Sequence, residues 1–405
     1  MSGADVTVLN NTNFGNLSKI LASEQTLWAN RGFDTTNIQA VDNAAKCLPV
    51  GQQADFGGED RFKFRKRGGR IHHAEVRLTV TAGVLAAGIA AAYVDDFSAA
   101  VNENARVEYA SKTIQEYVGE AEKAYHRLTK HDISRECYNA LALAGMPPGA
   151  AGGAEAQRQA NVTAQFQVTI PLSWMYFTTS EDYSLTPEAL SAELDFKMLY
   201  RRLEQLVYAR VIATGLVPTT DIWTTRPRIL TAELLTQLVV NTVPEKALHL
   251  STFEAAQGNI YKILDMERQL GYTVPAAAGT YTFKLDNCRL DAQMTIFFMR
   301  DNLIRTNYAV DRMQSDPTST ILSGGGSVAA LQPIISFRML ANGGTIVDTT
   351  TDLDNRALWR MRYMPGVQIA EAIYFVPWSW LVMDKKNVSG FQNFANLGES
   401  LLFIF

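Results

Sequence analysis

The feature that most constrains the fold is a two-residue alternation of apolar and polar side chains, which recurs in short segments along much of the chain. Phe62 and Phe64 alternate with cations, and residues 76–81 and 165–170 repeat the pattern with apolar side chains on one face. This period places successive side chains on opposite faces of a strand. Turn residues separate the segments, and strands do not alternate regularly with helices. The pattern therefore favours antiparallel sandwiches over a parallel α/β fold.

In the first half of the chain, strand patterns enclose a long excursion. Residues 61–81 predict a strand, a Gly-Gly turn and a second strand. Residues 114–144 predict one or two helices, and residues 146–157, MPPGAAGGAEAQ, predict an exposed flexible loop. Before the first strand, residues 17–31 have helical spacing and predict an N-terminal helix or arm.

In the last third, the strand pattern returns. Residues 281–286, 335–339 and 358–363 alternate as strands do, and residues 293–300 are apolar on both faces. A sandwich strand buries one face in its own core, so the second face of residues 293–300 needs a further cover. Residues 401–405, LLFIF, predict a paired strand, because an unpaired apolar end would expose a sticky edge.

Composition limits the class of protein. A chain of 405 residues corresponds to two or three domains at about 150 residues per domain. Hydrophobic residues make up 47% and charged residues 19%, which predicts a large core and some surface that other protein covers. The net charge of −4 argues against a strongly basic nucleic-acid coat.

The sequence shows no persuasive catalytic, metal or cofactor site. It contains no phosphate-binding loop, no Gly-x-Ser-x-Gly elbow and no His-Glu-x-x-His pair. The closest histidine pair on a predicted helix, His126 and His131, has poor spacing for a shared metal. Neighbouring acids such as Asp95 and Asp96 are better interpreted as solvated surface than as an acid–base pair. We therefore expect no enzyme activity and no cofactor.

One charge cluster is unusual, because six cations occur within ten residues and phenylalanines lie among them. One interpretation is a solvated strand face with a charged turn. The other is a surface that contacts phosphate or an acidic partner on one face of an assembly. The six candidate residues are Arg61, Lys63, Arg65, Lys66, Arg67 and Arg70.

Five segments, in chain order, carry a resemblance to a known family. They are residues 55–80, 93–128, 166–198, 281–302 and 373–405. The third, FQVTIPLSWMYF at its start, is similar to a family segment of the form I-P-L-x-F-W-F, and the last contains the matching pairs Ser-Gly at 389–390 and Asn-Phe at 393–394. Together they resemble the double jelly-roll major capsid proteins of large eukaryotic double-stranded DNA viruses, in the lineage that includes adenovirus-type and related phage capsids.

The resemblance implies a mainly β fold of two consecutive antiparallel jelly rolls with helical and loop insertions. It divides the chain into an N-terminal arm (1–54), a first jelly roll (55–240) and a second (241–405). It further implies a homotrimeric, pseudo-hexagonal capsomer in the capsid of a virion assembled inside the host cell. The trimer would contact neighbouring capsomers and minor capsid proteins, with the basic run facing the genome or an inner membrane.

Two alternatives remain open from the sequence. One is a scaffold or minor capsid protein of the same fold. The other is a two-jelly-roll amidase or glycosidase, which would need a carboxylate pair in a groove.

Overall fold

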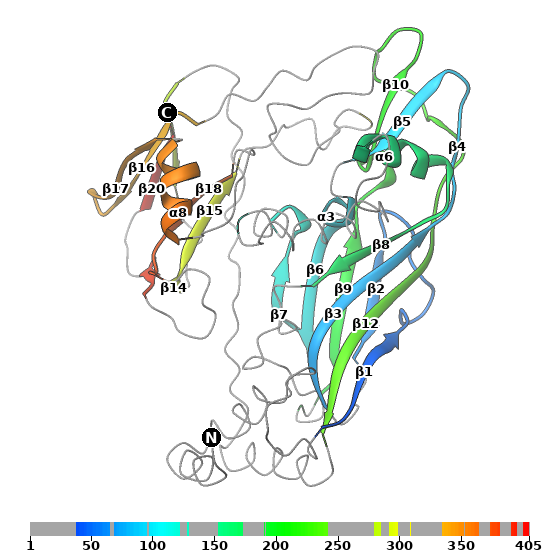
Figure 1. Ribbon diagram of the computed structural model, residues 1–405, viewed down its shortest axis with the longest axis horizontal. Helices are drawn as coiled ribbons and strands as arrows, with labels where there is room; N and C mark the ends of the chain where they lie inside the picture. Colours follow the sequence, from blue (N-terminus) through cyan, green and yellow to red (C-terminus); the bar gives the residue numbers. More distant parts are fainter. Residues whose placement is uncertain are drawn as a thin grey trace.

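The computed structural model places the strands in two groups, one from each half of the chain (Figure 1). Both groups consist of antiparallel pairs. The residues that the structure describes are 38–64, 69–94, 97–121, 128, 153–172, 190, 192–241, 279–284, 291–298, 308, 334–351, 353–363, 373–380, 390–394 and 400–404.

The first group is a sandwich of two four-stranded sheets. If its eight main strands are numbered one to eight along the chain, the order in one sheet is 1-8-3-6 and the order in the other is 2-7-4-5. This is the jelly-roll arrangement. The first sheet contains β1 (Ile38–Cys47), β12 (Ile229–Asn241), β3 (Gly69–Val80) and β8 (Phe166–Pro171). The second contains β2 (Glu59–Lys63), β9 (Leu194–Tyr200), β6 (Asn102–Tyr109) and β7 (Lys112–Tyr117).

The alternation seen in the sequence places one face of each sheet in a common core. Val76 and Leu78 on β3 are fully buried, as are Phe196 and Met198 on β9. These side chains belong to one continuous cluster that fills the space between the two sheets. Burial of this apolar surface is the main force that holds the sandwich together.

Short elements extend the sandwich beyond its main strands (Figure 1). Two further strand pairs join residues before β6 to residues after β9. They are β4 (Val84–Leu85) with β11 (Trp223–Thr225), and β5 (Ile89–Tyr93) with β10 (Val207–Val211). The helical elements whose bounds the structure describes include α3 (Phe97–Val101), α6 (Gly153–Thr163) and the 3-10 turn η5 (Leu203–Gln205).

The second group repeats the central pairings of the first. The order β13-β20-β16 corresponds to β1-β12-β3, and the pair β15-β18 corresponds to β2-β9. The elements are β13 (Tyr281–Lys284), β14 (Asp291–Ala292), β15 (Met294–Phe298), β16 (Ser336–Ala341), β17 (Gly344–Thr351), the π-helix η7 (Asp354–Trp359), α8 (Arg360–Tyr363), β18 (Ile373–Pro377), β19 (Gln392–Asn393) and β20 (Ser400–Ile404). The prediction that the C-terminal apolar residues form a paired strand is confirmed, because β20 pairs with β13 on one side and β16 on the other.

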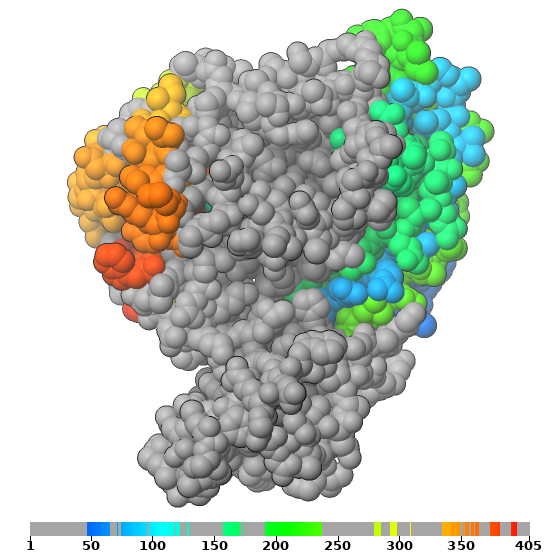
Figure 2. Space-filling model, in the orientation of Figure 1, coloured from blue at the N-terminus to red at the C-terminus, as the bar shows by residue number. Residues whose placement is uncertain are grey.

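The apolar second face of β15 is covered by side chains of the same chain rather than by a neighbouring subunit. Met294 and Ile296 pack with Ile373 and Phe375 of β18, and the cover includes Leu128. Trp359 and Tyr363, from the helical segment η7–α8, complete it. This helical segment and the strands β16 and β17 form part of the outer surface (Figure 2).

The structure corrects two secondary-structure predictions in the first half. Residues 114–117, expected to begin a helix, belong to β7 (Lys112–Tyr117), because a two-residue turn pairs this strand with β6. Residues 153–157, expected to be loop, begin helix α6, where the alanines favour helix. This helix is anchored by Arg158, whose buried Nη1 donates to the Tyr93 carbonyl over 3.0 Å.

Two further predictions are corrected. The strands β2 and β3 do not pair as a hairpin, because β2 pairs with β9 in one sheet and β3 pairs with β12 and β8 in the other. Residues 358–363, expected to be a strand, are helical. Helical spacing brings Trp359 and Tyr363 onto the same core while Met361 is 69% exposed.

Some predictions fall elsewhere. The helix at 17–31 lies outside the described residues. Residues 38–47, within the range assigned to an N-terminal arm, form β1, and β12 ends at Asn241 beside the expected boundary between the jelly rolls. Among the described residues, none of the helices has both the length and the apolar character needed to cross a bilayer.

Candidate functional site

Charged side chains cover the outer face of the sheet β2-β9-β6-β7. The same alternation that buries Phe62 and Phe196 turns their neighbours outward. We call this surface the charged sheet face. It comprises Glu59, Arg61, Lys63, Arg106, Glu108, Glu193, Asp195 and Lys197.

Ion pairs across the strands neutralise this face. Arg61 Nη2 lies 2.5 Å from Asp195 Oδ2, and Lys63 pairs with Glu193. The hydrogen bond to Asp195 raises the pKa of Arg61 above its ordinary value. Four cations thus face four carboxylates, so the described part of this face has no excess of positive charge.

Glu108 holds two neighbouring strands of the charged sheet face together. One carboxylate oxygen lies 3.1 Å from Arg106 Nε and the other lies 2.7 Å from Lys197 Nζ. Arg106 also reaches Glu59 Oε2 on β2 at 2.8 Å. The cations Arg106 and Lys197 stand opposite each other in the strand register, where they would repel each other if Glu108 did not lie between them.

The six residues of the basic run therefore fall into three groups. Arg61 and Lys63 are paired with acids on the charged sheet face. Arg70 lies near the start of β3, where its backbone is opposite Val239 of β12. Arg65, Lys66 and Arg67 lie outside the described residues.

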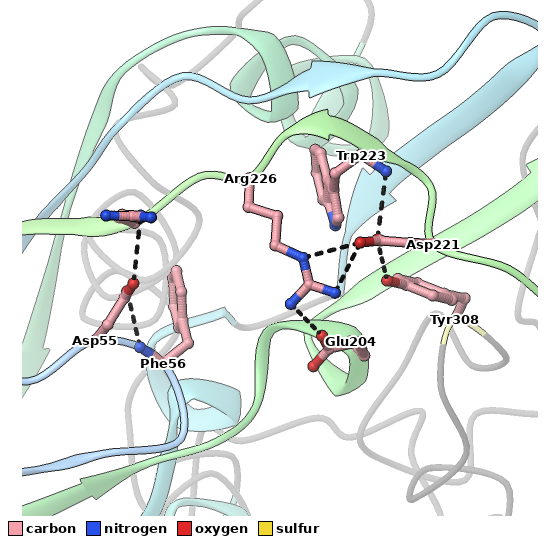
Figure 3. Close-up of polar contacts among 8 residues, drawn as sticks. Asp55, Phe56, Glu204, Asp221, Trp223, Arg226 and Tyr308 are labelled. Atoms are coloured by element: carbon pink, nitrogen blue, oxygen red, sulfur yellow. Dashed lines mark hydrogen bonds and ion pairs between the residues drawn. The ribbon is translucent and has the colours of Figure 1, made fainter.

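A second polar cluster joins distant parts of the chain (Figure 3). Asp221 and Arg226 lie on either side of β11, and Glu204 lies in η5. Arg226 donates to Asp221 Oδ2 from Nε over 3.0 Å and from Nη2 over 2.8 Å, and its Nη1 lies 2.9 Å from Glu204 Oε1. The Tyr308 hydroxyl donates to Asp221 Oδ1 over 3.3 Å.

The electrostatics of this cluster favour a fixed contact over proton transfer. Burial opposes the charge of Asp221, but the hydrogen bonds and positive charge of Arg226 outweigh it and lower the pKa of Asp221. Burial, together with the nearby carboxylates of Asp221 and Glu204, raises the pKa of Tyr308 to about 12. At neutral pH the cluster therefore holds an ionised aspartate and a neutral tyrosine.

Within the part of the chain that the structure describes, no three histidine, cysteine, aspartate or glutamate side chains group together as a metal site would require. The polar clusters described above are instead arranged as salt bridges and structural hydrogen bonds.

Comparisons with known proteins find similarity in the fold but not in the sequence. No protein-family model and no curated protein matches the sequence. Solved virus structures do match the fold. A chain of the PBCV-1 virus capsid has 14% identity and a TM-score of 0.67, covering 94% of this chain and 86% of that one. The Faustovirus major capsid protein has 10% identity and a TM-score of 0.66, covering 100% and 96%.

The chain has the double jelly-roll fold. This confirms the fold class expected from the sequence. A chain of the Sputnik virophage matches at 10% identity and a TM-score of 0.54. The match covers 94% of this chain and 84% of the virophage chain.

Sequence reasoning missed the Tyr308 cluster and the burial of Leu128. Tyr308 lies 87 positions from Asp221, and no local spacing connects them. The only sequence signal for Leu128 was indirect, namely the apolar second face of residues 293–300 that required a cover.

Proposed function

We propose that this protein is the major capsid protein of an icosahedral double-stranded DNA virus and resides in the virion capsid. The observation that carries the proposal is the fold match over nearly the whole chain, with a TM-score of 0.67 to a PBCV-1 capsid chain. This match favours a structural role over the amidase or glycosidase alternative.

Geometry supports a homotrimer as the building block. Each chain supplies two jelly rolls with the same central pairings, so three chains around a three-fold axis supply six similar units. Six similar units form a pseudo-hexagonal outline, which can pack beside neighbouring capsomers. We also propose that the two jelly rolls divide near residue 241, where β12 ends.

Exposed apolar side chains on the second jelly roll support assembly with other protein. Leu353 is 73% exposed, Met361 69% and Trp380 79%. Large aromatic and methionine side chains are typical of the buried centre of protein interfaces. Neighbouring capsomers and minor capsid proteins are the partners we propose for such surfaces.

Light scattering on the purified full chain tests the proposal. We expect a stable particle of three times 44.8 kDa, with a hexagonal outline in electron micrographs. A stable monomer would overturn the capsomer proposal. A trimer that forms neither shells nor flat hexagonal arrays, even at high concentration, would favour the scaffold or minor capsid role.

We further propose that the basic run contacts phosphates of the genome or of an inner membrane. Because Arg61 and Lys63 are already paired with acids, the contact depends on Arg65, Lys66, Arg67 and Arg70. The start of β3 lies at the end of the sandwich opposite β4, β5 and β10 (Figure 1), and Arg70 is the second residue of this strand. One end of the capsomer would then bind polyanions.

Binding of the trimer to duplex DNA and to anionic vesicles, measured over a salt series, tests this interaction. Replacing Arg65, Lys66 and Arg67 by Gln should weaken binding and reduce the salt slope for DNA by about 0.9 for each phosphate that the variant no longer neutralises. The matched control, Arg61→Gln with Lys63→Gln, should change the slope little. Equal weakening in both variants, or no salt-dependent binding by the unmodified trimer, would contradict the proposal.

A further inference from the structure

Tyr308 belongs by sequence to the second jelly roll but is buried in the first. It lies in the connection between β15 and β16, yet its side chain is only 4% exposed and packs in the core cluster of the first sandwich. Its backbone is held there as well. The Tyr308 N–H donates to the Glu204 carbonyl over 2.8 Å, and its carbonyl accepts from the Ala209 N–H over 3.3 Å.

The first jelly roll provides a complete receptor for this tyrosine (Figure 3). Glu204 binds the Tyr308 backbone, and Asp221 binds its hydroxyl. Arg226 connects these two residues, because it pairs with both carboxylates. The interactions form a closed ring from the Tyr308 backbone, through Glu204, Arg226 and Asp221, back to the Tyr308 hydroxyl.

The backbone of Tyr308 shows that this arrangement constrains the chain. Its φ angle is +59°, in the left-handed region that bulky side chains rarely adopt. Such a conformation persists only where the surroundings over-determine it, and strained residues concentrate at sites with a role. Here the backbone N–H, the carbonyl, the ring and the hydroxyl are all engaged by the first jelly roll.

Leu128 makes the opposite crossing. It follows β7 of the first jelly roll, yet it is fully buried against Ile373 and Phe375 of β18 in the second. It thereby covers the face of the β15-β18 pair that a sandwich core leaves open. Among the described residues, each jelly roll therefore supplies a buried side chain to the other.

We propose that Tyr308 and Leu128 are reciprocal anchors that fix the two jelly rolls in one relative orientation. Tyr308 is the positioning residue at one junction, with Glu204, Asp221 and Arg226 as its receptor, and Leu128 is the positioning residue at the other. The inference concerns the single chain and does not depend on the capsid proposal. If the anchors act together, loosening one must loosen the other, although they are buried in different jelly rolls.

A double-mutant cycle on the full chain tests this coupling. Tyr308→Ala and Leu128→Ala are made singly and together, and their folding equilibrium constants are compared by denaturant unfolding. If the two side chains have purely local roles, the effects of the two substitutions on the folding constant multiply. If they are reciprocal anchors, the effects do not multiply. Each single variant lowers the folding constant by some factor. We expect the double variant to lower it by a factor at least about threefold smaller than the product of the two single factors. The control pair, Tyr308→Ala with Phe394→Ala, should multiply, because Phe394 packs in the second core without touching Leu128. Multiplicative effects for Tyr308 and Leu128 would overturn the proposal.

A milder variant gives an independent test if the alanine variants do not fold. Arg226 is half-exposed, so Arg226→Gln opens the receptor ring without creating a core cavity. Hydrogen exchange should then accelerate at Tyr308 and Ala209, and also at Ile373 and Phe375 beside the other anchor, by at least about threefold. Lys63→Gln, which breaks an ion pair on the charged sheet face, should leave those amides unchanged. Acceleration confined to residues 204–226 and Tyr308 would overturn the proposal.

Discussion

The two jelly rolls share their central strand pairings but cover their apolar faces differently. The first encloses one continuous core between two four-stranded sheets. In the second, the described core falls into two smaller clusters, one on each side of the β15-β18 pair. The second cluster includes the helical segment η7–α8 and Leu128 from the first jelly roll. Strand order alone thus does not decide whether a jelly roll can bury all its apolar faces with its own residues. It also matters which part of the chain supplies the side chains that cover those faces.

Removing residues 400–405 should have the largest effect and should separate the two halves. This deletion takes away β20, which pairs with both β13 and β16, so the second sheet is left without its central strand. We expect the soluble trimer to disappear, while amides of β3 and β12 in the first jelly roll keep their protection in hydrogen exchange. Reduced protection in both halves would show that the first jelly roll is not self-sufficient, and a normal trimer would show that β20 is dispensable.

Two methionine truncations compare the completeness of the cores. Met198 on β9 is fully buried, so Met198→Ala should lower the free energy of unfolding by about 2–5 kcal/mol. Met294 on β15 is only partly buried, so Met294→Ala should cost about 1 kcal/mol. Denaturant unfolding measures both. Equal costs would mean that β15 is as completely covered as β9.

Alkaline unfolding measures what the first jelly roll gains from a residue of the second. The pKa of Tyr308 is raised, so the folded state favours the neutral phenol, and its contribution is complete below about pH 10. This contribution disappears as the pH rises from 10 towards 12, because a buried phenolate would face Asp221 and Glu204. We expect stability to fall by about 1–2 kcal/mol over this range in the unmodified protein. Tyr308→Phe should remove that part of the pH dependence, and an unchanged alkaline profile would contradict the assignment.

The smallest expected difference in stability concerns the tight turns of two hairpins, one in each jelly roll. Both loops have two residues with positive φ, Ala110-Ser111 between β6 and β7, and Asn342-Gly343 between β16 and β17. Asn-Gly suits this turn, whereas alanine and serine adopt it with strain. Replacing Ala110-Ser111 by Asn-Gly should stabilise the protein by about 1 kcal/mol, and Gly343→Ala should destabilise it by a similar amount. Thermal unfolding measures both changes, and a destabilised Asn-Gly variant would show that other interactions hold the strained turn.

Sequence patterns predicted strands well where local signals and the final environment agree. The strand at residues 336–339 and the apolar C-terminal strand were both expected, because periodicity is a local property. The Asn342-Gly343 turn that follows the first of these is likewise encoded by its own two residues. Ala110-Ser111 carries no such signal, so the hairpin that places residues 114–117 in β7 instead of the predicted helix could not be foreseen. Residues 358–363 show the opposite error, a predicted strand that is helical in the structure. Trp359 and Tyr363 are four positions apart, so they share a face both in a strand and after one turn of a helix.

The sites were less predictable than the strands. The basic run was visible as charge, but the acids that neutralise Arg61 and Lys63 lie about 130 positions away, at Glu193 and Asp195. The same distance problem hides the receptor of Tyr308. Ion pairs and buried anchors depend on which strands become neighbours, and a single sequence contains no direct record of that.

The position of β20 between β13 and β16 has a consequence for synthesis on the ribosome. The strands of the first jelly roll are all present once Asn241 has been made, so this half can fold while the rest of the chain is still emerging. The second cannot close its sheet until residues 400–404 appear, more than a hundred positions after β13. Throughout that interval the facing edges of β13 and β16 lack their partner and can pair with other nascent chains. Premature termination near the end of translation would therefore release a product with one finished jelly roll and one open sheet.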